Sequence, residues 1–329
     1  MNTTVKGLVS VVLPNRDHAH YLPTALDALL GQSWQNMEIL IVDDASSDNS
    51  RAVIQDYAAR DPRVTSIYLA KNVGVNRAVE AAMPRIRGEY LCTAAADDFV
   101  APEFFANSVC LLGKFPAAGL CFSDPTECYE PDQRLLSFPL YLSTEPVNYD
   151  PESLRRLIAH NHFSISSNTV IYRTEAFRQA GGYHDDLGWL SDWFVTVAVA
   201  LRHGACYLPE ALTFLRIRKD SFSVLKLKDA ASHRRPFDHF LALLSLPDYA
   251  DVAAAMQAAG VLPEYRLRTL RWLSESEEGR KFLSPRLFWQ IISKSMWSLL
   301  RPISPIWLRR KLRIVSSRRA AKNVSGDRA

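Results

Sequence analysis

Four short apolar runs recur along the first part of the chain, and each is followed by polar residues. The runs are rich in β-branched side chains, which is typical of strands buried on both faces of a sheet. A segment long enough for a helix separates each run from the next. The pattern therefore predicts an α/β fold with a mostly parallel, Rossmann-like sheet flanked by helices. The predicted strands are Leu8–Leu13, Met37–Val42, Val64–Ala70 and Glu89–Ala96.

The polar residues after these runs predict a ligand site. In a parallel sheet every strand points the same way, so the groups at the strand ends converge on one edge, where ligands of open α/β sheets bind. The groups are Pro14-Asn15-Arg16-Asp17, Asp43-Asp44, Lys71-Asn72 and Asp97-Asp98. The chemistry expected at this edge is therefore mostly that of carboxylates.

The remaining sequence predicts further helices and strands. We expect Asp124–Asp150, which contains four prolines, to be an irregular excursion that contacts substrate. Beyond Lys219 the apolar periodicity is helical almost throughout. The further strands are expected at Gly119–Ser123, Thr169–Arg173 and Ala211–Ile217, and the helices at Tyr21–Gly31, Arg51–Ala59, Asn76–Met83, Pro102–Leu112, Pro151–His160, Thr174–Ala180 and Ser191–His203.

Composition excludes several classes of protein. The chain has 329 residues, of which 48% are apolar and 22% charged, as expected for a globular protein. Its first apolar run is a strand of the fold, so we expect no signal peptide, and no apolar stretch is long enough to cross a bilayer. The five cysteines show no Cys-x-x-Cys spacing. Reduced thiols in the cytoplasm are the expected state, without a disulfide framework or a zinc site.

Charge is divided unevenly along the chain. From Arg280 onward there are thirteen Lys and Arg and one acid, so this segment carries +12 and the remainder −8. Tryptophans accompany the basic residues in an amphipathic pattern over Arg286–Leu300, which predicts contact with an anionic membrane surface. A helix packed on the catalytic body with a solvated basic face is the alternative. Nucleic acid is not expected as a partner, because no recognition motif accompanies the charge.

The strand-end residues narrow the ligand class. A dinucleotide site requires a glycine-rich turn after the first strand, and the residues 15–20 contain no glycine. Aspartates can approach a diphosphate through a divalent cation, and hard oxygen ligands favour Mg²⁺ or Mn²⁺ over zinc. Asp43 and Asp44 can accept hydrogen bonds from a base or a ribose. These features favour a nucleotide-sugar site over a dinucleotide site.

A series of motifs in order and spacing resembles glycosyltransferase family 2. The resemblance covers about the first two thirds of the chain and implies a GT-A fold and sugar transfer from a nucleoside diphosphate donor, UDP-linked, with inversion at the anomeric carbon. The motifs are Val11–Asn15, Ile41–Asp48, Asn72–Val75, Gly88–Tyr90, Asp97-Asp98 before Pro102, Gly181–Tyr183, Leu187-Gly188, Ser191–Trp193 and Leu215–Arg218.

The resemblance assigns roles to individual residues. It places Asp192 as the catalytic base that deprotonates the acceptor hydroxyl. It implies nucleotide binding by Pro14, Asn15, Arg16, Asp43, Asp44, Asn72 and Asp97, and metal binding by Asp97 and Asp98, with Asp98 as the preferred direct ligand. Trp193 and Arg218 are assigned to the diphosphate or the acceptor. The acceptor is expected to be a cell-envelope glycan or a glycolipid, reached from the cytoplasmic face of the membrane.

Three residues depart from the family pattern. Ala95 stands where the first acid of the metal motif is usual, and Ser191 replaces an acid beside Asp192. Arg218 stands where a histidine often completes the metal site; an arginine cannot ligate a cation, but it can pair with a diphosphate. A non-catalytic binding protein on a degenerate transferase fold therefore remains an alternative.

The same evidence predicts a domain organisation. We expect a GT-A domain over residues 1–220, with a nucleotide-sugar half at 1–123 and an acceptor half at 124–220. A helical, basic C-terminal extension is expected over 221–329.

Overall fold

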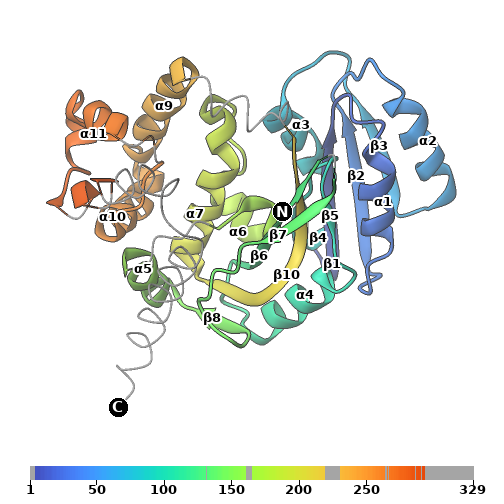
Figure 1. The fold of residues 1–329 in the computed structure, drawn as a ribbon, viewed down its shortest axis with the longest axis horizontal. Coiled ribbons are helices and arrows are strands. Elements are labelled where there is room, and N and C mark those ends of the chain that lie inside the picture. Colours follow the sequence, from blue (N-terminus) through green and yellow to red (C-terminus); the bar gives the residue numbers. More distant parts are fainter. Residues whose placement is uncertain are drawn as a thin grey trace.

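A computed structural model describes residues 4–130, 132–160, 165–218, 230–263, 265, 267–285, 287–289 and 291–292. Within these residues one sheet of ten strands forms the centre of the molecule (Figure 1). Its main path is β3-β2-β1-β4-β9-β6-β10-β5, while β7 pairs with β6 and β8 with β10. The strands are β1 (Val5–Asn15), β2 (Met37–Asp43), β3 (Val64–Tyr68), β4 (Gly88–Thr93), β5 (Phe99–Val100), β6 (Leu120–Tyr129), β7 (Arg134–Ser137), β8 (Val147–Tyr149), β9 (Val170–Arg173) and β10 (Ala205–Ile217).

The first half of the sheet has the predicted parallel arrangement. Strand β1 pairs in parallel with β2 and β4, and β2 pairs in parallel with β3. All seven residues of β2 are buried, as expected for a strand covered on both faces. The carboxyl ends of β1 to β4 therefore meet at one edge of the sheet. Strand β9 runs antiparallel to both β4 and β6, so the sheet is mixed and mostly parallel.

Helices cover both faces of the sheet and create two apolar cores. One core joins the sheet to α1 (Leu22–Leu30), α2 (Ser50–Arg60) and α4 (Phe104–Lys114). The other joins it to α3 (Val75–Ala82), α5 (Pro151–His160), α6 (Thr174–Gln179) and α7 (Ser191–His203). Apolar residues recur at helical spacing in α1, where Leu22, Leu26 and Leu29 are buried. The fold class and its helical C-terminal part are confirmed.

Three expected boundaries are wrong. The segment Asp124–Asp150 is not irregular throughout, because β6 continues to Tyr129 and is followed by β7 and β8. The last strand begins at Ala205 rather than at Ala211. Its pairing with β6 shifts register beside Pro125, which a regular ladder could not accommodate because proline lacks an N–H. Strand β4 ends at Thr93, so Asp97 and Asp98 lie in the turn after the strand.

The C-terminal helices share a core with the body. They are α9 (Arg234–Leu244), α10 (Ala250–Ala259), α11 (Leu267–Ser274) and α12 (Glu277–Arg280), with short 3₁₀ turns η4 (Ala230–His233) and η5 (Pro247–Tyr249). Phe240 of α9 packs against Phe194 of α7 with ring centroids 6.0 Å apart. No helix in the described part of the chain is long and apolar enough to span a bilayer. The predicted basic tail over 293–329 lies outside the described residues.

Candidate active site

The ends of β1 and β2 are joined by buried polar side chains. Asn15 Nδ2 donates to Asp43 Oδ1 at 3.0 Å and to Ser46 Oγ at 3.1 Å. Asp43 also accepts from Ser46 Oγ at 2.5 Å and from the Ser46 backbone at 3.2 Å. Asn15 and Asp43 are 2% and 5% exposed. Within the described residues Asn15 Oδ1 has no donor, which makes it an acceptor available to a ligand at this edge.

Asp44 fixes the loop that follows β3. Its carboxylate accepts from the backbone N–H groups of Val73 at 2.7 Å and Gly74 at 2.9 Å. Asn72 Oδ1 accepts from the same Gly74 N–H at 3.0 Å. Gly74 has a φ of +89°, a backbone conformation that residues with a side chain rarely adopt, so glycine is favoured where the loop turns into α3. The structure therefore brings Asp44 and Asn72 together, with the Asp44 carboxylate engaged by the backbone.

The loops after β1 and β2 hold two non-glycine residues in the left-handed region. Asp17 has a φ of 54° and Ala45 a φ of 56°. The Asp17 carboxylate accepts from the Ser47 backbone at 2.6 Å, and these interactions hold the pKa of Asp17 below its usual range. Arg16 donates to the backbone carbonyl of Asp44 at 2.7 Å. Such unfavourable backbone conformations persist where surrounding contacts hold them, often beside ligand sites.

Of the two acids after β4, Asp98 is turned inward and Asp97 is paired with an arginine. Asp98 accepts from the Arg216 backbone N–H at 2.8 Å and from Asn168 Nδ2 at 3.1 Å. Burial, reinforced by the nearby charge of Asp97, raises the pKa of Asp98 to about 7. Asp97 forms an ion pair with Arg218 at 3.3 Å. The two acids thus differ in their partners, with Asp98 held by two protein donors and Asp97 paired with an arginine.

Asp192 lies in the first turn of α7. Its Oδ2 accepts from Ser167 Oγ at 2.5 Å, and its Oδ1 accepts from the Trp193 backbone at 2.7 Å. Burial raises the pKa of Asp192, while these hydrogen bonds oppose the rise. The Trp193 ring packs 6.0 Å from Phe240 of α9, at the junction with the C-terminal helices. A carboxylate held in this way can accept a proton from a substrate hydroxyl.

A short turn connects the two acidic groups. The turn η2 (Ser167–Thr169) supplies Ser167 to Asp192 and the next residue, Asn168, to Asp98. Sequence reasoning missed both residues. A signal existed: because β9 is antiparallel to β4, the residues before β9 lie at the same edge as the carboxyl ends of the parallel strands. Polar residues at the start of an antiparallel strand deserve the same weight as those at the end of a parallel one.

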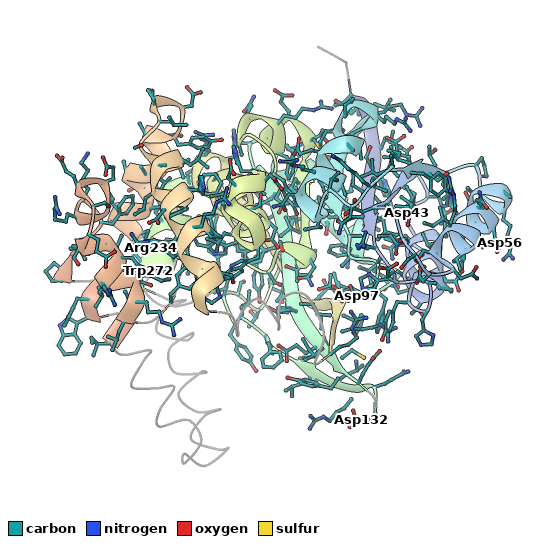
Figure 2. All side chains as sticks on the ribbon, turned by 90° about the horizontal axis from the view of Figure 1, so that it is seen from above. Asp43, Asp56, Asp97, Asp132, Arg234 and Trp272 are labelled. Atoms are coloured by element: carbon teal, nitrogen blue, oxygen red, sulfur yellow. The ribbon has the colours of Figure 1, made fainter. Side chains whose placement is uncertain are left out.

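The β1–α1 loop links the nucleotide residues to the acids of the other half. Tyr21 places its ring 4.6 Å from the Arg218 guanidinium, and His18 Nε2 lies 3.4 Å from Arg218 Nη2. Pro14 remains inside β1, opposite Val42. In Figure 2, Asp43 and Asp97 lie in the same half of the molecule, away from Arg234 and Trp272 of the C-terminal helices. These contacts therefore divide the predicted residues into two groups joined through this loop.

The residues do not form a complete metal-binding set. In the described part of the chain, no three His, Cys, Asp or Glu side chains are grouped as cation ligands. Asp98 already accepts two protein donors, and Asp97 is paired with a guanidinium. The predicted Mn²⁺ or Mg²⁺ would thus meet the Asp97 carboxylate beside a fixed positive charge.

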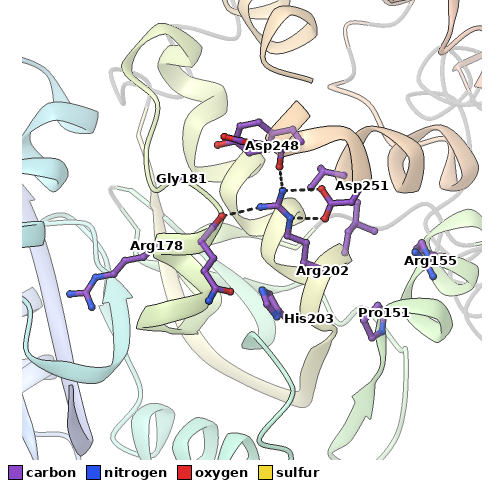
Figure 3. A pocket seen from close by; sticks show the side chains of 12 residues that line it. Pro151, Arg155, Arg178, Gly181, Arg202, His203, Asp248 and Asp251 are labelled. Carbon is purple, nitrogen blue, oxygen red and sulfur yellow. Dashed lines mark hydrogen bonds and ion pairs between the residues drawn. The ribbon is translucent and has the colours of Figure 1, made fainter. Parts of the chain in front are cut away.

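A separate hollow lies among the helices. A cavity of about 810 Å³ opens where α5, α6 and α7 meet η5 and α10 (Figure 3). Arg202 is central to it and binds Asp251 and the carbonyls of Gln179 and Asp248. None of the predicted site residues lines this cavity, which separates it from the strand-end site.

Comparison with known proteins establishes the family. The sequence profile of "Glycosyl transferase family 2" matches residues 10–180. The chain belongs to this family, and its fold is of the GT-A type. The resemblance deduced from the motifs is confirmed.

Curated relatives are similar over part of their length. An uncharacterized protein of Mycobacterium tuberculosis is 29% identical over 215 residues, covering 63% of this chain and 58% of the relative. The chain thus spans less than three fifths of the first such relatives. The putative teichuronic acid biosynthesis glycosyltransferase TuaG of Bacillus subtilis is 35% identical over 96 residues, which is 29% of this chain and 38% of TuaG.

Solved structures share the fold at low identity. Staphylococcus aureus TarS 1–349 in complex with UDP-GlcNAc has a TM-score of 0.63 and 15% identity, covering 97% of this chain and 92% of that one. The mannosyltransferase PcManGT of Pyrobaculum calidifontis, in complex with GDP-Man and Mn²⁺, has a TM-score of 0.52 and 18% identity, covering 88% and 86%.

Proposed function

We propose that this chain is an inverting glycosyltransferase that moves a sugar from a UDP-linked donor to a hydroxyl of a cell-envelope glycan or lipid-linked acceptor. The observation that carries the proposal is the placement of Asp192, connected through η2 to the acids that follow β4. Neighbouring residues of this turn contact the proposed base and the donor-binding edge. This arrangement suits a displacement at the anomeric carbon. Family membership and the UDP-GlcNAc complex of TarS support the donor class.

The proposed step is a single displacement. The acceptor oxygen attacks the anomeric carbon while its proton passes to Asp192, and the bond from that carbon to the diphosphate oxygen breaks. The electron pair of that bond stays on the diphosphate, which gains negative charge. Burial has raised the pKa of Asp192 toward values useful to a base at neutral pH. Inversion follows because attack and departure occur on opposite faces of the sugar.

The roles of the nucleotide residues follow from their contacts. Asn15 Oδ1 is available to accept from a base N–H, while Asp43 holds the Asn15 amide in place. Asp44 shapes the Asn72–Gly74 loop through its two backbone hydrogen bonds, so its part in binding is through that loop. Arg16, Asp97 and Arg218 complete the edge that faces the nucleotide. Either the Arg218 guanidinium or a divalent cation would neutralise the charge of the diphosphate.

Turnover and binding must be measured separately to test this function. Release of UDP from UDP-GlcNAc and other UDP-hexoses, with water or added glycan as acceptor, reports turnover. Asp192→Asn should lower turnover by roughly a hundredfold or more, while UDP affinity measured by calorimetry changes less than about twofold. The exposed Asp186→Asn is the matched control. Full turnover in Asp192→Asn would refute the assignment of the base.

A non-catalytic binding protein is the second candidate, because Ala95, Ser191 and Arg218 depart from the family pattern. It predicts that UDP-sugars bind and raise the melting temperature, but that no donor is consumed with any acceptor or cation. UDP release in the wild-type protein excludes it.

We further propose that the C-terminal segment docks on the cytoplasmic face of an anionic membrane. Leu287 and Ile291 are each 3% exposed and pack onto the body, while Phe288 and Trp289 are 52% and 68% exposed. One face of this segment is thus buried and an aromatic face is outward. The +12 charge from Arg280 onward complements anionic lipid headgroups.

Membrane docking is testable with vesicles. The full chain should sediment with vesicles that contain phosphatidylglycerol, but it should not sediment with neutral vesicles. The double variant Phe288→Ser/Trp289→Ser should reduce the bound fraction several-fold. Leu246→Ser, at a position 49% exposed, is the control. Unchanged sedimentation of the double variant would refute docking through this face.

A further inference from the structure

The ion pair between Asp97 and Arg218 is enclosed at the strand-end site. The Asp97 Oδ2 to Arg218 Nη2 distance is 3.3 Å, and the two side chains are 18% and 11% exposed. Asp97 lies in the turn after β4, and Arg218 is the first residue after β10. The ends of two strands thus place a permanent positive charge where the nucleotide residues and the acids meet.

Packing holds the Arg218 guanidinium in place. The Tyr21 ring lies between two arginines, 4.6 Å from the Arg218 guanidinium carbon and 5.2 Å from that of Arg216. The Tyr21 hydroxyl donates to Glu130 at 3.0 Å, and Arg216 pairs with Glu130 at 3.2 Å. A guanidinium stacked on an aromatic ring loses little further entropy when it binds an anion. The site therefore presents an already positioned donor for oxyanions.

The same arrangement disfavours a divalent cation. A cation on Asp97 would lie beside a guanidinium that cannot lose its proton, because arginine stays charged in proteins. Arg218 occupies the sequence position from which a histidine ligand would come, and Ala95 supplies no carboxylate. A diphosphate, by contrast, can take two parallel hydrogen bonds from one guanidinium.

We propose that Arg218 supplies to the donor diphosphate the positive charge that a divalent cation supplies in other transferases, so that donor binding and turnover do not require a cation. The proposal rests on the proposed transferase function and specifies how its leaving group is stabilised. Asp97 holds the guanidinium before the donor binds, and Arg218 then offsets the charge left on the diphosphate as the sugar departs.

UDP binding tests the proposal independently of turnover. Calorimetry with UDP, on protein stripped of metal by EDTA, should give an affinity within about twofold of that with Mn²⁺ added, whereas Arg218→Met should weaken UDP at least tenfold. Arg218→Lys should recover part of the loss, because lysine retains the positive charge but lacks the planar pair of N–H donors of a guanidinium. Arg63→Met, which removes another partly buried pair with Asp61, is the matched control. Melting temperatures verify that each variant is folded.

The outcomes separate the two proposals. If EDTA weakens UDP binding more than tenfold and Mn²⁺ restores it, the role of Arg218 is overturned while the transferase function stands. If UDP binding is unaffected by EDTA but depends on Arg218, the arginine role is supported even where no turnover is found. Failure of UDP and GDP to bind under any condition overturns both. If the Arg218→Met variant binds UDP with the affinity of the wild-type protein, the role of Arg218 is also overturned.

Discussion

The Ser167 hydroxyl donates a 2.5 Å hydrogen bond to Oδ2 of Asp192. This contact joins a turn that precedes an antiparallel strand to the first turn of a helix, and it points the carboxylate toward the site edge. The Trp193 backbone holds the other oxygen. The proposed base thus has a fixed orientation, and its ionisation depends on a neighbour that can be changed without touching the carboxylate.

Ser167→Ala should make the activity of the enzyme more sensitive to acid. The lost hydrogen bond favours the ionised form of Asp192, so its removal raises the pKa of Asp192 further. A base must be ionised to act, and the acidic limb of the kcat/KM profile therefore moves to higher pH. We expect a loss of activity that grows as the pH falls and recovery at higher pH.

Two phenols near Asp192 do not account for such a limb, whereas Asp98, with a pKa of about 7, titrates in the same range. The charge of Asp192 acts on Tyr172 and Tyr183, and burial raises the pKa of both phenols, so both stay neutral. Ser167→Thr retains the hydroxyl and should restore the wild-type profile. An equal loss at every pH in Ser167→Ala would instead indicate a purely structural role for this serine.

Asn168 and Asp98 should be energetically coupled. Asn168 Nδ2 donates to Asp98 at 3.1 Å in a mostly enclosed position. Hydrogen bonds to charged groups contribute about 1.5–3 kcal/mol, so Asn168→Ala should reduce stability. Asp98→Asn should change stability less, because burial disfavours the ionised form of the carboxyl group that it removes. A double-mutant cycle by urea denaturation should give a coupling of about 1 kcal/mol or more. Additive effects would show that the contact contributes nothing to stability.

The parallel half of the fold was accessible from the sequence, for a physical reason. Strands such as β2 are buried on both faces, so their apolar runs and polar ends appear directly in the residue pattern. The convergence of Asn15 with Asp43, and of Asp44 with the Asn72 loop, follows from strand direction alone. These predictions required no knowledge of side-chain geometry.

Other features could not be predicted in this way. Strands β7 and β8 lie at exposed or edge positions, and all four residues of β7 are exposed, so no apolar run marks it. The inward orientation of Asp98 depends on Asn168 and on the Arg216 backbone, which are 70 and 118 residues away in sequence. Which of two adjacent acids faces the ligand is decided by such distant partners.

Asp44→Ala should destabilise the protein as well as weaken donor binding. The carboxylate is 3% exposed and accepts from the Val73 and Gly74 backbone. Its removal leaves the Val73 N–H without its acceptor and the Gly74 N–H with Asn72 Oδ1 alone. Urea denaturation should therefore show a loss of about 1–3 kcal/mol.

The stability measurement distinguishes two roles for Asp44. A residue that serves only to bind the nucleotide often lowers the stability of the folded protein. Its replacement would therefore leave the free energy of unfolding unchanged or raise it. Asp56→Ala removes an exposed carboxylate paired with Arg60 and is the control, with an expected change below about 1 kcal/mol. Asp44→Ala with full stability and lost UDP binding would assign this acid to the nucleotide rather than to the loop.

Arg202 should anchor the C-terminal helices to the catalytic body. Its side chain is 15% exposed, and it binds Asp251 through two hydrogen bonds of 2.8 and 2.9 Å. It also donates to the carbonyls of Gln179 at 3.0 Å and Asp248, as Figure 3 shows. One guanidinium thereby cross-links α6, α7, η5 and α10. Arg202→Met should cost about 1–2 kcal/mol, because it removes several hydrogen bonds in exposed positions, where water replaces part of each.

Hydrogen exchange can show where that cost falls. Asp251 is 59% exposed and regains water when Arg202 is removed, so the ion pair itself contributes little and the carbonyl contacts should account for most of the loss. Protection should fall first in η5 and α10 and remain unchanged in β1 and β2. Arg77→Met, which removes an exposed pair with Asp185, is the control. Arg202→Lys should be intermediate, since an ammonium cannot reach three partners in one plane. If protection falls uniformly across the chain instead, Arg202 contributes to global stability and does not specifically hold the C-terminal helices.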